Sequence, residues 1–205
     1  IPIYLGHDSA DVYFNQKEYY LDKDGRPTLV AGVPPDFFAE DVQLWGNPIY
    51  KWDEMAKNDY AFWVDRFKWN QLAYDVIRLD HFRAFDTYWV IDGKSETAAN
   101  GEWLIGPRNH FFDAMYKHIP NLQLVVEDLG DLRPEVLELR DDYNLMGMTI
   151  IQFHLKPHEV ESSLKEAKNL LAYTGTHDNK TLLGRLEELS ADEQLELSEI
   201  LKSHG

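Results

Sequence analysis

The stretch YDVIRLDHFRAF, residues 74–85, decides the fold class that we predict for this chain. It begins as a short apolar run typical of a buried strand, and Asp80 and His81 follow that run directly. Two later apolar runs also lead to acids, at Glu127 and at Asp178. In parallel α/β folds, functional groups gather where strands end, because the connecting loops form a crevice there. The pattern predicts a parallel α/β fold with a site built from strand-end acids.

Short apolar runs and helical signals alternate along the chain. The runs that we expect to form buried strands of a parallel sheet are 1–6, 74–80, 122–130, 147–155 and 169–175. The segments that we expect to be helical are 107–119, 131–143 and 158–169, followed by a terminal helix. Asp131 is the expected N-cap of the second helix, Pro134 suits its first turn, and Ser190 with Glu193 fits a capping box. Strand and helix in alternation predict βα units.

If these units belong to a (β/α)8 barrel, also called a TIM barrel, the barrel is incomplete in this chain, which holds its middle and lacks both ends. Five strands are too few to close such a barrel, which takes about 250 residues. The chain begins in an apolar run without an initiator Met and ends within a helical pattern, as expected for a piece of a longer protein. We therefore expect residues 1–205 to be a partial catalytic barrel domain. A long loop-rich insertion over residues 8–70, after the first strand, is expected to shape its substrate groove.

The composition narrows the range of partners. The 205 residues are 44% hydrophobic, enough for a sizeable core, and their formal net charge is -16. A surplus of acids without a basic patch argues against nucleic acid and anionic membrane as partners and favours a neutral substrate. The chain has no cysteine, so disulfides and thiolate metal sites are excluded, and a cytoplasmic location is expected. No apolar run approaches the roughly 20 residues that span a bilayer.

The spacing of the three acids suits glycoside chemistry. Asp80 and Glu127 lie 47 positions apart, and Glu127 and Asp178 lie 51 apart, room each time for a loop, a helix and a returning strand. A retaining glycosidase needs two carboxyl groups about 5 to 5.5 Å apart, one as nucleophile and one as acid/base. Arg78 shares a strand face with Asp80, so its charge is expected to lower the pKa of that carboxyl, as suits a nucleophile.

Other polar and aromatic side chains suit the binding of a sugar. His81 and His177 each adjoin one of the acids and are placed to donate hydrogen bonds to hydroxyl groups. Trp45 and Trp52 offer flat faces for pyranose rings.

Simpler interpretations compete at each position. A strand-end acid beside a basic residue is often a structural ion pair or a helix cap, and the loop around Asp178 can exist only to satisfy backbone donors. Trp63, Trp69 and Trp89 are expected in the core rather than at a sugar. His7 with Asp8, and His154, lack the spacing of a helical zinc site. The three strand-end acids also suit a Mg²⁺-dependent barrel enzyme.

Six motifs in one order carry a resemblance to a known family. They are AGVPPDFF, QLWGNPIYKW, RLDHFRAF, VVEDLG, GMTIIQF and YTGTHDN, and the similar region runs from HDSADVYFN to about Leu183. The sequence resembles the 4-α-glucanotransferases (amylomaltase or disproportionating enzyme), glycoside hydrolase family 77 of the α-amylase clan. The resemblance implies that the predicted strands are the third to seventh of the barrel.

The resemblance also implies an activity and a set of roles. The activity is transfer of α-1,4-glucan segments between maltooligosaccharides by a retaining double displacement, without metal or organic cofactor. Asp80 matches the nucleophile, Glu127 the general acid/base and Asp178 the acid that stabilises the transition state. The positions that match substrate-binding residues are Arg78, His81, His177, Asp8, Trp45, Asn47 and Trp52. An α-glucan hydrolase of the same clan and a catalytically incomplete glucan-binding fragment remain alternatives, and the oligomeric state stays open.

Three positions depart from the pattern of the family. Ala84 and Arg108 stand where glycine is common, and Lys180 stands where an acid or a small residue is more usual. The three acids are intact.

Overall fold

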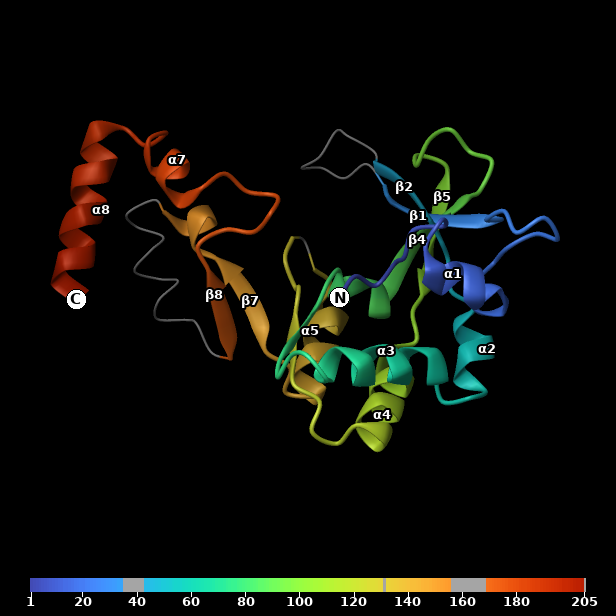
Figure 1. Ribbon diagram of the computed structural model, residues 1–205. Helices are drawn as coiled ribbons and strands as arrows, with labels where there is room; N and C mark the ends of the chain where they lie inside the picture. The colour runs from blue at the N-terminus through green and yellow to red at the C-terminus, as the bar shows by residue number, and fades with distance from the viewer. Residues whose placement is uncertain (35–42, 131, 156–168, 205) are drawn as a thin grey trace. The chain divides into compact units, whose positions relative to one another are not determined.

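The computed structural model describes residues 1–34, 43–130, 132–155 and 169–204 (Figure 1). The chain forms two compact units, Ile1–Leu145 and Met146–Gly205, and each is described by itself below. Half of the motif AGVPPDFF, the expected N-cap Asp131 and nearly all of the expected helix 158–169 lie outside the described residues.

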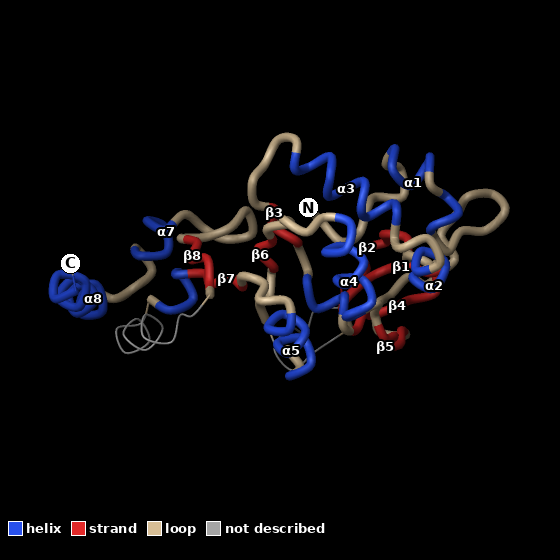
Figure 2. Tube along the Cα trace, turned by 90° about the horizontal axis from the view of Figure 1, so that it is seen from below, coloured by secondary structure: helices blue, strands red, loops and turns tan. Residues whose placement is uncertain are grey.

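An antiparallel sheet of four strands forms one part of the first unit (Figure 2). Its order is β2-β1-β4-β5, and the strands are β1 (Leu29–Val33), β2 (Gln43–Pro48), β4 (Thr87–Asp92) and β5 (Gly101–Ile105). Gly32 is needed in β1, because a Cβ there would lie 2.5 Å from the carbonyl oxygen of Gln43 on β2. The sequence pattern did not predict this sheet, and the segment 8–70 has more regular structure than the expected loop.

A parallel pair of strands, β3 (Ile77–Leu79) and β6 (Leu124–Val126), forms a second sheet in the same unit. Both were predicted from their apolar runs, and both are shorter than those runs. The run 1–6, by contrast, is not a strand. Only Ile1 pairs with β3: its amino group donates to the carbonyl of Arg78, and its carbonyl accepts from the amide of Asp80 at 2.9 Å. This is the hydrogen-bonding pattern of a parallel ladder.

The helices of the first unit bury one face each around an aromatic core. They are α1 (Ala10–Phe14), α2 (Trp52–Ala56), α3 (Ala61–Gln71), α4 (Arg108–His118) and α5 (Pro134–Asp142), with short 3₁₀ turns η1 (Gln16–Glu18) and η2 (Phe82–Phe85). On α3 the buried residues are Trp63, Val64 and Phe67, the spacing of one helix face. The Trp63 ring lies 5.3 Å from the Phe111 ring of α4, measured between centroids.

Two of the predicted helices are confirmed by α4 and α5. Pro134 is the first residue of α5, as expected, although the residue before it, Arg133, is the N-cap. Of the three tryptophans expected in the core, not all are buried. Trp63 is fully buried, whereas Trp69 is 73% exposed, so its assignment to the core was wrong. Trp89 is half-buried against a small cluster and donates its indole N–H to the carbonyl of Ala98.

Ala84 and Arg108, which stand where the family commonly has glycine, both lie in this unit. Ala84 is buried in the core. Arg108 has φ 45, a left-handed conformation that favours glycine. Its guanidinium lies 3.1 Å from the buried carboxylate of Asp86, which Arg133 also approaches at 3.7 Å. The ion pair gives the arginine a structural role that glycine cannot have.

The second unit contains a parallel pair, β7 (Gly147–Ile150) and β8 (Leu170–Tyr173), in the register Gly147 to Leu170. The 3₁₀ turn η3 (Ile151–His154) follows β7, and the helices α7 (Leu182–Leu186) and α8 (Ala191–His204) follow β8. The predicted capping box at the start of α8 is confirmed, because Ser190 N donates to Glu193 Oε2 at 2.8 Å and Glu193 N donates to Ser190 Oγ at 3.3 Å.

Within the residues described, no helix is both long and apolar enough to cross a membrane.

We expect Trp63→Ala to lower the free energy of unfolding by about 3 to 5 kcal/mol, because it removes a large buried ring and leaves a cavity. Denaturant unfolding followed by circular dichroism measures this change. Trp69→Ala is the matched control: it changes the same residue type on the same helix at an exposed position, and should cost about 0.5 kcal/mol or less. Equal losses in both variants would contradict this account of the core.

Candidate active site

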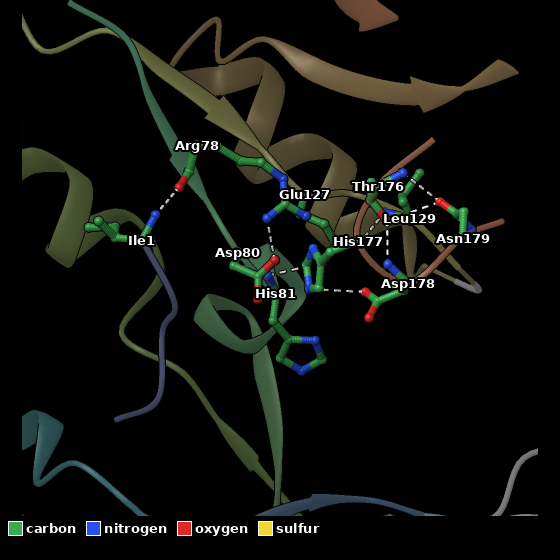
Figure 3. Close-up of polar contacts among 10 residues, drawn as sticks. All are labelled: Ile1, Arg78, Asp80, His81, Glu127, Leu129, Thr176, His177, Asp178 and Asn179. Atoms are coloured by element: carbon green, nitrogen blue, oxygen red, sulfur yellow. Dashed lines mark hydrogen bonds and ion pairs between the residues drawn. The ribbon is translucent and has the colours of Figure 1, made fainter. Parts of the chain in front are cut away.

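Asp80 and Glu127 lie side by side where β3 and β6 end (Figure 3). The ladder pairs Leu79 with Val126 and continues one step beyond the strands. Glu127 N donates to the carbonyl of Leu79 at 2.9 Å, and Phe82 N donates to the carbonyl of Glu127 at 3.0 Å. Backbone hydrogen bonds therefore fix the two acids next to one another, as the strand-end pattern predicted.

Two backbone amides hold the carboxylate of Glu127. His81 N donates to Oε2 at 3.0 Å, and Leu129 N donates to Oε1 at 3.2 Å. Burial raises the pKa of Glu127, and the neighbouring charge of Asp80 adds to the rise, against the two amide bonds and the charge of Arg78. A raised pKa lets this carboxyl keep its proton at a pH where an ordinary glutamate has lost it. That property suits a general acid.

Asp80 forms an ion pair with the arginine two residues before it. Arg78 Nη1 lies 2.5 Å from Asp80 Oδ1, so the two side chains share a face of β3, as predicted. The backbone amide of Asp80 is also held, by the carbonyl of Ile1. The carboxylate is thereby oriented by a cation on one side and by a fixed backbone.

His81 lies between the acids and an aromatic group. Its backbone is left-handed, with φ 54, and its ring lies 4.9 Å from that of Trp45, edge on. Burial lowers the pKa of His81 to about 4, assisted by the charge of Arg83, while Asp80 opposes the shift. The imidazole is therefore neutral at neutral pH. Sequence analysis missed a third ring, that of Tyr4, 6.4 Å from His81 and 6.3 Å from Trp45.

The tryptophans predicted to bind sugar have different environments. Trp45 lies on β2 and is 37% exposed, and Asn47 follows two positions later on the same strand. Trp52 is only 7% exposed, packed against Tyr50 and Phe85 in the aromatic core. Its ring packs mainly in the core, and its predicted part in a substrate site stays a prediction.

Two further acids of the first unit, Asp8 and Asp128, have different surroundings. Asp8 lies in an exposed turn before α1, and its role stays a prediction. Asp128, next to Glu127, has a buried side chain that pairs with Arg140 at 2.8 Å. That pair is the structural ion pair that the simpler interpretation anticipated.

The second unit presents Asp178 in a tight turn. The turn runs from Thr176 to Asn179. The backbone N–H of Asn179 donates to the backbone carbonyl of Thr176 at 3.1 Å. Asn179 Oδ1 accepts from Thr176 N at 2.8 Å, and Asp178 N donates to Thr176 Oγ1 at 3.3 Å. The side chains of His177 and Asp178 are both exposed, with Nε2 3.4 Å from Oδ2. The roles of His177 and Asp178 toward a sugar stay predictions.

Among the residues that the structure describes, no three His, Cys, Asp or Glu side chains converge as metal ligands would. The ammonium group of Lys180 forms an ion pair with Glu188. The unusual residue after the turn is thus engaged by a partner further along the chain.

Comparison with known proteins gives consistent results. The sequence model of the family described as 4-alpha-glucanotransferase matches residues 1–205. A 4-alpha-glucanotransferase of Synechocystis is 43% identical over 199 residues, which cover 95% of this chain and 39% of that protein. A relative in Arabidopsis thaliana, named as a chloroplastic/amyloplastic 4-alpha-glucanotransferase, is 39% identical and covers 100% of this chain and 36% of its own length.

A solved structure agrees with these sequence relatives. An amylomaltase from Streptococcus agalactiae in complex with acarbose superposes with a TM-score of 0.85 at 34% identity, over 96% of this chain and 40% of that one. The chain thus spans about two fifths of the length of the relatives that it matches. With the family model matched over all 205 residues, this chain belongs to the 4-alpha-glucanotransferase family.

Proposed function

We propose that the protein carrying this chain is a 4-α-glucanotransferase, which transfers α-1,4-glucan segments between maltooligosaccharides with retention of configuration. The observation that carries the proposal is the fixed pairing of Asp80 and Glu127 at the ends of β3 and β6. Its substrate class is supported by the relatives named 4-alpha-glucanotransferase and by the amylomaltase solved with acarbose.

The geometry of a parallel ladder suits a retaining mechanism. Neighbouring strands lie about 4.7 to 4.9 Å apart, and Asp80 and Glu127 occupy consecutive places beyond one register. Retaining enzymes need their two carboxyl groups about 5 to 5.5 Å apart, so that one attacks the sugar while the other protonates the leaving oxygen. The wider separation of inverting enzymes, about 6.5 to 9.5 Å, leaves room for a water. Strand pairing therefore favours retention.

The reaction then follows from the roles of the two acids. Asp80 attacks the anomeric carbon, and Glu127 gives its proton to the departing glucan oxygen, leaving a glycosyl ester on Asp80. A glucan acceptor loses a proton to Glu127 and displaces Asp80, which restores both groups. Ester formation removes the charge of Asp80, one of the causes of the raised pKa of Glu127. The pKa of Glu127 therefore falls while the ester exists, which favours the carboxylate form that takes the proton of the acceptor.

The other predicted residues surround this pair. Arg78 orients the nucleophile through its ion pair, and the neutral ring of His81 is suited to hydrogen bonds with sugar hydroxyls. Trp45 presents a partly exposed indole beside His81, and Asn47 and Asp8 complete the proposed subsites. Asp178 is proposed to stabilise the positively charged ring of the transition state, with His177 binding the same sugar.

We also infer that residues 1–205 form the middle of a (β/α)8 barrel, from its third strand to its seventh. The parallel pairs β3–β6 and β7–β8 support this arrangement, and α4 lies between β3 and β6 in the chain as a barrel helix would. In this proposal the insertion 8–70 contributes β1 and β2, and Trp45 on β2 reaches the substrate groove.

We expect Asp80→Asn to reduce glucan transfer at least about a thousandfold, because an amide does not serve as the nucleophile. The assay incubates the enzyme containing this chain with maltotriose and separates the products by length. Transfer yields glucose together with a ladder of longer maltooligosaccharides. Asp75→Asn, an exposed acid five residues earlier, is the matched control and should leave the ladder unchanged. Glucose and maltose without longer products would show a hydrolase instead.

We expect the pKa of Glu127 to fall in Asp80→Asn, because the variant removes a neighbouring negative charge while burial stays. Carbon-13 NMR titration of the Glu127 carboxyl measures the pKa directly, without need for activity. In the unmodified enzyme, kcat/KM for maltotriose should decline as pH rises through the raised pKa of Glu127, since the protonated form is the acid. A Glu127 pKa that is the same in both proteins would remove the proposed electrostatic coupling of the pair.

A further inference from the structure

Gln152 is a buried polar side chain for which the proposed reaction has no direct use. It lies in η3, directly after β7, and is only 5% exposed. A buried amide is costly unless it is hydrogen-bonded, so its partner indicates its role. Gln152 Nε2 donates to the backbone carbonyl of Lys180 at 2.7 Å.

The same amide nitrogen lies against the other side of the turn that carries Asp178. A Cβ on Gly175 would come within 2.4 Å of Gln152 Nε2. The backbone of Gly175 is not left-handed, so the nearness of the amide, rather than φ, is what excludes a side chain there. Gln152 Nε2 thus lies between residues 175 and 180, across the base of the turn.

Local hydrogen bonds close the tip of the turn. Thr176 and Asn179 close it, and Asp178 occupies its third position with an exposed carboxylate. The side chain of Lys180 pairs with Glu188 further along the chain, so its carbonyl is the group that Gln152 holds. The bond from Gln152 ties the base of this turn to η3, directly after β7.

We propose that Gln152 is a positioning residue for transfer: its buried amide holds the base of the 175–180 turn and so sets the place of Asp178. The inference rests on the proposed function, since it takes Asp178 as the acid that stabilises the transition state. Gln152 itself need not touch the substrate. Small displacements of a catalytic group cost about a hundredfold per ångström, so a loosened turn lowers the rate even when the fold survives.

The first test is Gln152→Met in the enzyme containing this chain, because methionine keeps the length of the side chain and removes the donor. We expect kcat for transfer from maltotriose to fall about tenfold to a hundredfold, with a change in KM of less than about threefold. Gln194→Met is the matched control. Gln194 also donates to backbone carbonyls in this unit, those of Leu186 and Leu189, but it is exposed and remote in sequence from the turn.

The second test separates positioning from general support of the fold. In an Asp178→Asn background, Gln152→Met should lower the remaining kcat by less than about threefold, because the group that it positions is already gone. A merely structural glutamine would lower kcat by the same factor in both backgrounds, and that result would overturn the proposal. Unchanged kcat in Gln152→Met alone, beside a large loss in Asp178→Asn, would overturn it too. If Asp178→Asn itself leaves transfer intact, the failure lies in the proposed function.

Gly175→Ala gives an independent route should Gln152→Met fail to fold. The new methyl group displaces the Gln152 amide without changing Gln152, and we expect a similar fall in kcat with KM little altered. Adding Gln152→Ala makes room for that methyl group without restoring the bond to Lys180. We therefore expect the double variant to regain stability, seen as a higher melting temperature, but not kcat. Recovery of kcat in the double variant would contradict a role for the amide.

Discussion

The parallel pairing of β3 with β6 is the constraint on which the candidate site depends. Its register continues past the ends of both strands, so backbone hydrogen bonds hold Asp80 and Glu127 next to each other. Neither acid relies on a flexible side-chain contact to find the other. The position of the main chain is in turn fixed by the core beneath, where the side chains of Ile77 and Leu79 are buried. Moving either strand by one residue would turn its acid toward the opposite face.

The aromatic core gives this pair of strands a rigid support. Rings from several separate elements meet there, among them those of Trp52 on α2, Trp63 on α3 and Phe111 on α4. Because interiors are packed at crystal density, a ring in this cluster cannot shift without moving its neighbours. Phe82 and Phe85 belong to the same cluster and directly follow His81 in η2, so the core continues to the edge of the site.

Burial and backbone amides act on the two acids in different ways. Partial burial of Glu127 raises its pKa, whereas Asp80 forms an ion pair with Arg78. Two neighbouring carboxyl groups with different surroundings can take different roles, one as a proton donor and one as a nucleophile. The second unit supports its acid by another device, a short turn closed by Thr176 and Asn179 with a buried glutamine at its base. Lys180, unusual for the family, is compatible with this turn because its charge is paired elsewhere.

The sequence by itself determined the features that depend on local pattern. Short apolar runs predicted β3, β6, β7 and β8, and the capping box predicted the start of α8. The motif order identified the family, and the adjacency of Asp80 and Glu127 followed from the parallel pairing. Only the tertiary structure decided the antiparallel sheet, because the pairing of β1 with β4 joins segments about sixty residues apart and leaves no periodic signal of its own. It alone also showed that Trp45 is partly exposed while Trp52 packs in the core, and it revealed Gln152, since the burial of a side chain is set by the elements that pack around it.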